Sequence, residues 1–159
     1  MKSSTLKEIK TELQHRSQSE LLELCLRLGR FKKENKELLT YLLFEANDER
    51  GYIESVKEYI DEQFEEVNTK SYYFIRKSVR KILTNTKKFI RYSKNKETEV
   101  ELLLYFCKKL KDFRPSIKRS VRLMNVYTRQ LAMIEKTVSG LHEDLQYDYQ
   151  LEIERLGNS

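Results

Sequence analysis

The sequence predicts an all-α protein: an irregular antiparallel helical bundle, or a short α-α superhelix, of six or seven helices with a long C-terminal helix. Two observations carry this prediction. Turn-forming residues are scarce, because the 159 residues include only four Gly and one Pro, well below average usage. Apolar residues, 39% of the chain, recur at helical steps of three and four. The length suits one domain, so residues 1–159 are expected to form a single helical domain with frayed ends at 1–4 and 157–159.

Helix-start signals and breaks divide the chain into seven expected helices. Thr5, Ser17 and Thr98 are each followed three residues later by Glu, which is the spacing of a capping box. The clearest breaks fall at Asn47-Asp48, Asn68-Thr69 and Arg114-Pro115. The expected helices span residues 5–15, 18–29, 31–46, 49–67, 71–95, 98–113 and 116–156.

The last of these segments carries a heptad-like apolar pattern between residues 124 and 145. One long helix is expected here, with Ser139-Gly140 as the place where it would kink or stop. The seam has two interpretations: a stripe that faces the core of the monomer, or the contact of a homodimer through the C-terminal helix. The seam residues are Met124, Tyr127, Leu131, Ile134, Val138, Leu141 and Leu145.

Glycine-rich binding loops are excluded by the composition. Phosphate- and dinucleotide-binding loops need neighbouring glycines, because their backbone adopts positive φ or approaches the ligand closely. The four glycines, at positions 29, 51, 140 and 157, are far apart. We therefore expect any ligand to be bound by side chains on helix faces.

Charge is distributed unevenly along the chain. The formal net charge is +6, but residues 70–129 alone hold 18 Lys and Arg against 4 Asp and Glu. Residues 45–66, by contrast, hold nine acids and two bases. On a helical wheel, segment 71–95 is apolar on one side and purely cationic on the other, and Asn85-Thr86 is the point where it could break. The basic region 70–122 is therefore the candidate for binding.

Three interpretations of this basic region remain open. The bases are solvated or paired within the chain with the acids of 45–66, at up to ~1 kcal/mol for each surface pair. Alternatively, they contact an anionic partner, such as nucleic acid or an acidic protein. The third interpretation, a basic amphipathic helix on a membrane surface, is disfavoured because the apolar stripe is needed for the core. The candidate contact residues are Arg76, Lys77, Arg80, Lys81, Lys87, Lys88 and Arg91.

Aromatic residues alternate with these bases, as stacking on single-stranded nucleic acid requires. Since no helix-turn-helix, zinc-finger or RNA-recognition signature is present, contacts to nucleic acid would be mainly to phosphate. The interleaved aromatic residues are Tyr72, Tyr73, Phe74, Phe89 and Tyr92.

No catalytic, metal or cofactor site is predicted. His15 and His142 lie near opposite ends of the chain, so neither forms an evident pair with a nucleophile. Glu12-x-x-His15 matches half of a di-iron helix motif, but the second half is missing because Ser139 stands three residues before His142. We therefore expect a protein that is not an enzyme.

The two cysteines and the apolar stretches complete the sequence-based expectations. Cys25 and Cys107 lie in Leu-rich runs without a CxxC pair, so both are expected to be buried free thiols. The longest apolar stretches, 38–44 and 102–107, are far shorter than the ~20 residues of a membrane span, and no apolar leader segment is seen. A cytoplasmic location is the resulting expectation.

Together these patterns predict a non-catalytic helical interaction or scaffold protein whose basic region 70–122 contacts an anionic partner. The alternative is a purely structural homo-oligomer assembled through the 124–145 seam. In that case the basic face would be paired within the chain with the acids of 45–66.

Overall fold

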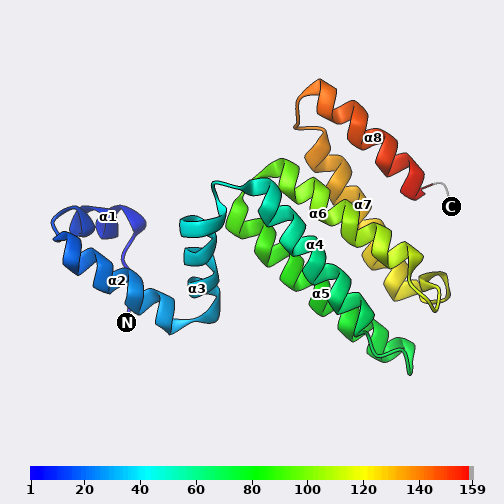
Figure 1. Ribbon diagram of the computed structural model, residues 1–159, viewed down its shortest axis with the longest axis horizontal. Helices are drawn as coiled ribbons and strands as arrows, with labels where there is room; N and C mark the ends of the chain where they lie inside the picture. The colour runs from blue at the N-terminus through cyan, green and yellow to red at the C-terminus, as the bar shows by residue number, and fades with distance from the viewer. Residues whose placement is uncertain (158–159) are drawn as a thin grey trace. The chain divides into compact units, whose positions relative to one another are not determined.

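The structure, a computed structural model, describes residues 1–157. Every regular element in this range is helical (Figure 1), which confirms the all-α class. The chain forms two compact units, Met1–Phe44 and Glu45–Ser159, where the sequence predicts one domain. No helix within residues 1–157 combines the length and the apolar character needed to cross a membrane.

The first unit contains three helices: α1 (Leu6–Gln14), α2 (Gln18–Phe31) and α3 (Lys33–Thr40), which continues into a π-helical turn at Tyr41–Glu45. The capping box predicted at the start of α1 is confirmed. The Thr5 hydroxyl accepts from the Glu8 amide at 3.3 Å, and the Glu8 carboxylate accepts from the Thr5 amide at 2.7 Å. Residues 1–4 precede α1 and carry no helix.

The second unit is a bundle of five helices, and consecutive helices run antiparallel (Figure 1). α6 lies in the middle, because it packs against each of the other four. α4 and α5 also pack against each other on one side of it, and α7 against α8 on the other. The helices are α4 (Glu49–Glu65), α5 (Tyr72–Ser93), α6 (Lys96–Asp112), α7 (Val121–Val138) and α8 (Glu143–Gly157), with a 3-10 turn at Ile117–Arg119.

The core of this bundle is centred on α6. Apolar side chains are buried around most of its circumference, as expected for a helix with neighbours on several sides. α4 contributes Ile60 and Phe64, whereas α5 contributes Ile75 and Val79, all of them buried. The buried apolar residues of α6 are Val100, Leu102, Leu103, Leu104, Phe106, Cys107 and Leu110.

The prediction of one long C-terminal helix over 116–156 is wrong. α7 ends at Val138 and α8 begins at Glu143, so the chain turns at the predicted Ser139-Gly140 site. The 124–145 seam is thereby divided between two helices, and Tyr127, Ile134 and Val138 are buried in the bundle of their own chain. These seam residues therefore belong to the core of the monomer and are not exposed for a second copy. The homodimer interpretation of the seam is not supported.

Two local predictions are corrected as well. Asn95, not Thr98, caps α6: its side chain accepts from the amides of Glu97 and Thr98 at 2.9 and 3.2 Å. α5 is continuous through residues 85–86, because the buried Thr86 hydroxyl is satisfied inside the helix by the Ile82 carbonyl at 2.8 Å. The C-terminal end, residues 157–159, was expected to be frayed. Gly157 is instead the last residue of α8, and residues 158–159 lie outside the described part of the chain.

Candidate functional site

The basic side chains of α5 are held on one rigid helix. Ser71 caps its start by accepting from the Phe74 amide at 3.5 Å. Its apolar side packs against α4 and α6, and Ile75, Val79 and Ile82 are buried there. This fixes the opposite side toward solvent. We call the residues on that side the α5 basic surface: Arg76, Lys77, Arg80, Lys81, Lys87, Lys88 and Arg91.

Most of the α5 basic surface is accessible and unpaired. Lys77, Arg80, Lys81 and Arg91 are exposed, whereas Arg76 is half-buried. None of these five forms an ion pair with another residue of the described chain. Lys87 and Lys88 are half-buried, and the Lys88 ammonium lies 5.6 Å from the centroid of the Phe89 ring.

Charged residues of segment 45–66, both acidic and basic, are engaged by α6. Asp61 contacts Lys109 Nζ at 2.6 Å and accepts from the Tyr105 hydroxyl at 2.7 Å. Burial raises the pKa of Asp61, but the two hydrogen bonds and the charge of Lys109 together outweigh burial and hold the pKa below its usual value. On the neighbouring turns, Glu101 pairs with Arg50 at 3.1 Å and with Lys57 at 3.5 Å. Charge pairing of α4 is thus directed largely to α6.

Two of the five interleaved aromatic residues are available for stacking. Tyr73 and Phe74 are 60% and 41% exposed, and their rings meet edge to face at 5.4 Å between centroids. Tyr73 stands three residues before Arg76, so it lies over the same side of the helix. The others have structural roles: Tyr72 donates to the Ser116 carbonyl at 2.8 Å, whereas Phe89 and the buried Tyr92 pack together at 6.2 Å.

A pocket of about 520 Å³ lies at the C-terminal end of α5. Lys87 and Arg91 line it together with Lys94 and Lys96, and Glu99 is the one acid among the lining residues. Its apolar lining comes from Ile90, Leu103 and Met133. We call it the α5 end pocket.

Charge in the α5 end pocket is only partly balanced. Lys96 Nζ contacts Glu99 at 3.2 Å, so one of the four cations has an acidic partner. Burial lowers the pKa of Lys87, and the charge of Glu99 opposes this shift. Lys94 and Lys96 were not among the predicted contact residues. Lys94 shares the side of the helical wheel that carries Lys87 and Arg91, whereas Lys96 joins them only through the turn between α5 and α6. Lys94 takes the left-handed conformation (φ 56°) in that turn. Lys88 is not among the lining residues. The other candidates, Arg76 to Lys81, lie at least ~9 Å farther along the helix.

Another pocket, of about 600 Å³ and lined mainly by charged residues, lies between α4, α6 and α8. It was not predicted, since its residues come from three distant segments. Its charged lining consists of Arg50, Lys57, Glu101, Lys108, Lys111, Asp112, Glu152 and Arg155.

The remaining chemistry-bearing residues do not converge. Among residues 1–157, no group of three His, Cys, Asp or Glu side chains is placed to hold a metal ion. Cys107 is buried, as predicted, and burial raises the pKa of its thiol to about 12. The prediction for Cys25 is wrong, because this residue is exposed on α2. A comparison of the chain with known protein families, curated proteins and solved structures finds no match.

Proposed function

We propose that the protein is a non-catalytic helical module that binds single-stranded nucleic acid through the α5 basic surface, mainly by contacts to phosphate. The observation that carries this proposal is the set of five bases on α5 without an ion pair in the described chain. From Arg76 to Arg91 they extend over ~22 Å of helix. Such an elongated cationic surface matches the regular negative charge of a nucleic-acid backbone.

Single strands fit better than duplexes because of the exposed aromatic residues. Tyr73 and Phe74 lie at the beginning of α5, next to Arg76 and Lys77. Bases stack on such rings with little sequence preference, while the neighbouring cations contact phosphate. The expected binding is therefore tolerant of sequence and strongly dependent on salt.

An acidic protein segment is the second candidate, and the α5 end pocket favours it. Ile90, Leu103 and Met133 provide an apolar lining beside four cations. A protein segment carries both carboxylates and apolar side chains, and so it would use both parts of this pocket.

The experiment is a fluorescence anisotropy titration with a labelled single-stranded oligonucleotide at several salt concentrations. If five cations contact phosphate, the slope of log K against log salt is about −3.5, at about −0.7 for each contact. An acidic peptide is titrated in parallel. Flat titrations with the oligonucleotide at low salt would refute nucleic-acid binding, and binding of the peptide alone would favour the second candidate.

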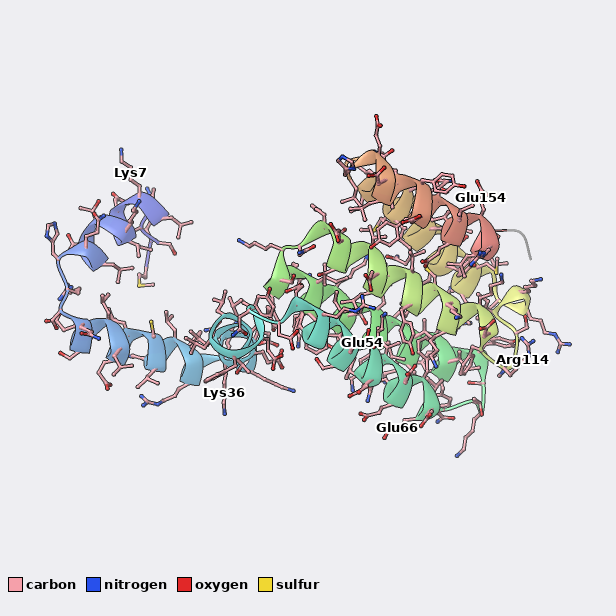
Figure 2. The ribbon with its side chains drawn as sticks, turned by 45° about the horizontal axis from the view of Figure 1, so that its top comes forward. Lys7, Lys36, Glu54, Glu66, Arg114 and Glu154 are labelled. Atoms are coloured by element: carbon pink, nitrogen blue, oxygen red, sulfur yellow. The ribbon has the colours of Figure 1, made fainter. Side chains whose placement is uncertain are left out.

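A matched pair of variants locates the contact. Charge reversal on α5 is expected to abolish binding, whereas the same change of net charge elsewhere is expected to weaken it only slightly. The control residues are exposed, and Figure 2 shows Lys7 and Lys36 projecting from α1 and α3. The test variant is Arg76→Glu/Arg80→Glu/Arg91→Glu, and the control is Lys2→Glu/Lys7→Glu/Lys36→Glu.

A further inference from the structure

A row of cations along α5 ends in the α5 end pocket. On a helical wheel, Arg76, Arg80, Lys87 and Arg91 fall within about 60°, so they form one row along the helix. Lys87 and Arg91 belong both to this row and to the lining of the pocket. The row does not continue into α6, because the first turn of α6 carries two glutamates. A strand bound along this row is therefore expected to end at the pocket.

Three of the four cations in the pocket have no carboxylate partner. Within residues 1–157, Lys87, Arg91 and Lys94 form no ion pair, whereas Lys96 pairs with Glu99. The pocket therefore holds more positive charge than its own residues neutralise.

Lys87 is partly removed from water. Its side chain is half-buried, and burial lowers the pKa of its ammonium group. That group donates to the sulfur of Met133 at 3.5 Å, and a thioether sulfur is only a weak acceptor. Removing a charge from water is costly unless an opposite charge pairs with it. An anionic group bound in the pocket would supply the missing charge.

The α5 end pocket also has the size and lining for a nucleotide. Its volume of about 520 Å³ lies within the range of roughly 300–1,000 Å³ that is usual for small-ligand sites. Ile90, Leu103 and Met133 form an apolar lining beside the cations. A sugar and base can pack against this lining while a phosphate contacts the cations.

The phosphate at the end of a strand differs in charge from those inside it. An internal phosphodiester carries one negative charge, whereas a phosphate monoester carries about 1.5 to 2 negative charges near pH 7. Three unpaired cations around one pocket match the monoester. Arg76 and Arg80, which are ~6 Å apart along the helix, match successive diesters instead.

We propose that the α5 end pocket binds the terminal nucleotide of the strand through its phosphate monoester, at either the 5′ or the 3′ end. The terminal phosphate contacts Lys87, Arg91 and Lys94, and the sugar and base pack against the apolar lining. This inference rests on the function proposed for the α5 basic surface. It adds recognition of a strand end to binding that is otherwise tolerant of sequence.

Competition experiments with the full chain test this proposal, with fluorescence anisotropy of a labelled oligothymidylate as the readout. The unlabelled competitors are one oligothymidylate in three forms, which end in a 5′-phosphate, in a 3′-phosphate, or in hydroxyl groups at both ends. A fourth competitor, longer by one nucleotide and ending in hydroxyls, controls for the added charge. At least one phosphorylated form is expected to bind about tenfold more tightly than both hydroxyl-ended forms, as one additional charge-assisted hydrogen bond would give.

A matched pair of double variants locates the terminal phosphate. Lys87→Gln/Lys94→Gly is expected to remove the preference for the phosphorylated form. Lys94 has a positive φ of 56°, which glycine adopts more easily, so the substitution at this position is expected to leave the fold intact. Arg76→Gln/Arg80→Gln removes the same charge, but it is expected to weaken all competitors equally and to leave the preference unchanged. Circular dichroism verifies that both variants fold.

The outcomes separate this inference from the proposed function. Equal affinity of the phosphorylated and hydroxyl-ended competitors would overturn the inference and leave nucleic-acid binding in place. So would a preference that persists in Lys87→Gln/Lys94→Gly, because the phosphate would then lie elsewhere. If that variant lost affinity only for the acidic peptide, the pocket would belong to a protein segment. Absence of binding by every oligonucleotide would refute the proposed function itself.

Discussion

The Thr98 hydroxyl donates to Glu49 Oε1 at 2.6 Å, which joins the first turn of α6 to the first turn of α4. The same carboxylate oxygen accepts from the Ser93 hydroxyl at the end of α5. One glutamate thus connects three helices at one end of the bundle. Thr98 is fully buried, so this link is shielded from water.

Replacing Thr98 with valine is expected to destabilise the protein by about 2 kcal/mol. The shape of the side chain is kept, but a hydrogen bond to a charged group is lost in a buried place. Chemical denaturation followed by circular dichroism measures the change. Thr128→Val is the control, because the exposed Thr128 hydroxyl donates only to carbonyls of its own helix; a similar loss in both variants would contradict this role of Thr98.

Gly51 and Asp48 are coupled at the start of α4. The Asp48 carboxylate caps the helix by accepting from the Gly51 amide at 3.0 Å, and a Cβ atom at position 51 would collide with that carboxylate. Gly51→Ala is therefore expected to cost about 1 kcal/mol, the value of a helix cap. In an Asp48→Ala background the same substitution should stabilise the protein by up to about 1 kcal/mol, because Ala favours helix over Gly. A double-mutant cycle by denaturation checks this change of sign.

Alkaline pH is expected to destabilise the bundle through three tyrosines. Burial raises the pKa of Tyr105, Tyr127 and Tyr149 to about 12, and for Tyr105 the hydrogen bond to Asp61 adds to the effect. The unfolded value is about 10, so the folded protein favours the neutral form. The stabilisation is fully present below pH ~10 and is lost as the pH rises toward ~12.

The measurement is the denaturation midpoint as a function of pH, together with tyrosinate absorbance. Tyr127→Phe is expected to reduce the pH dependence, and it also removes the hydrogen bond to the Leu156 carbonyl at 2.8 Å. A wild-type midpoint that is constant over this range would refute the expectation.

The two cysteines are expected to differ in reactivity. Cys25 is exposed, whereas Cys107 is buried with a thiol pKa of about 12, and the thiolate is the reactive form. A thiol reagent should therefore modify one cysteine of the native protein and both after unfolding. Cys25→Ser should leave no rapidly reacting thiol; rapid labelling of that variant in its native state would contradict the burial of Cys107.

Local signals predicted the helices well because capping and breaking depend on neighbours in sequence. Thr5 and Ser17 accept from the amides three residues later as predicted. The turn at Ser139-Gly140 falls at the place where the expected long helix would kink or stop. Thr98 was assigned wrongly because its spacing to Glu101 matches a cap, while Asn95, three residues earlier, occupies that place. Its actual partner, Glu49, is distant in sequence and close only through packing.

Burial and pockets depend on tertiary contacts, so the sequence predicted them less well. Cys25 lies in a Leu-rich run like that of Cys107, but only the helix of Cys107 has neighbours on several sides. Similarly, the bases of α5 were predicted from their periodicity. The same periodicity places Lys94 beside Lys87 and Arg91, but the position of Lys96 in the α5 end pocket required the geometry of the turn that connects α5 to α6.

The central position of α6 makes the second unit a single cooperative element. Removal of α4 and α5, or of α7 and α8, would expose one apolar side of the central helix to water, so neither half has a complete core. Amide hydrogens of α6 are therefore expected to exchange with solvent only through global unfolding. The helices of the first unit bury little apolar surface. Their amide hydrogens are therefore expected to exchange through local opening, without unfolding of the bundle.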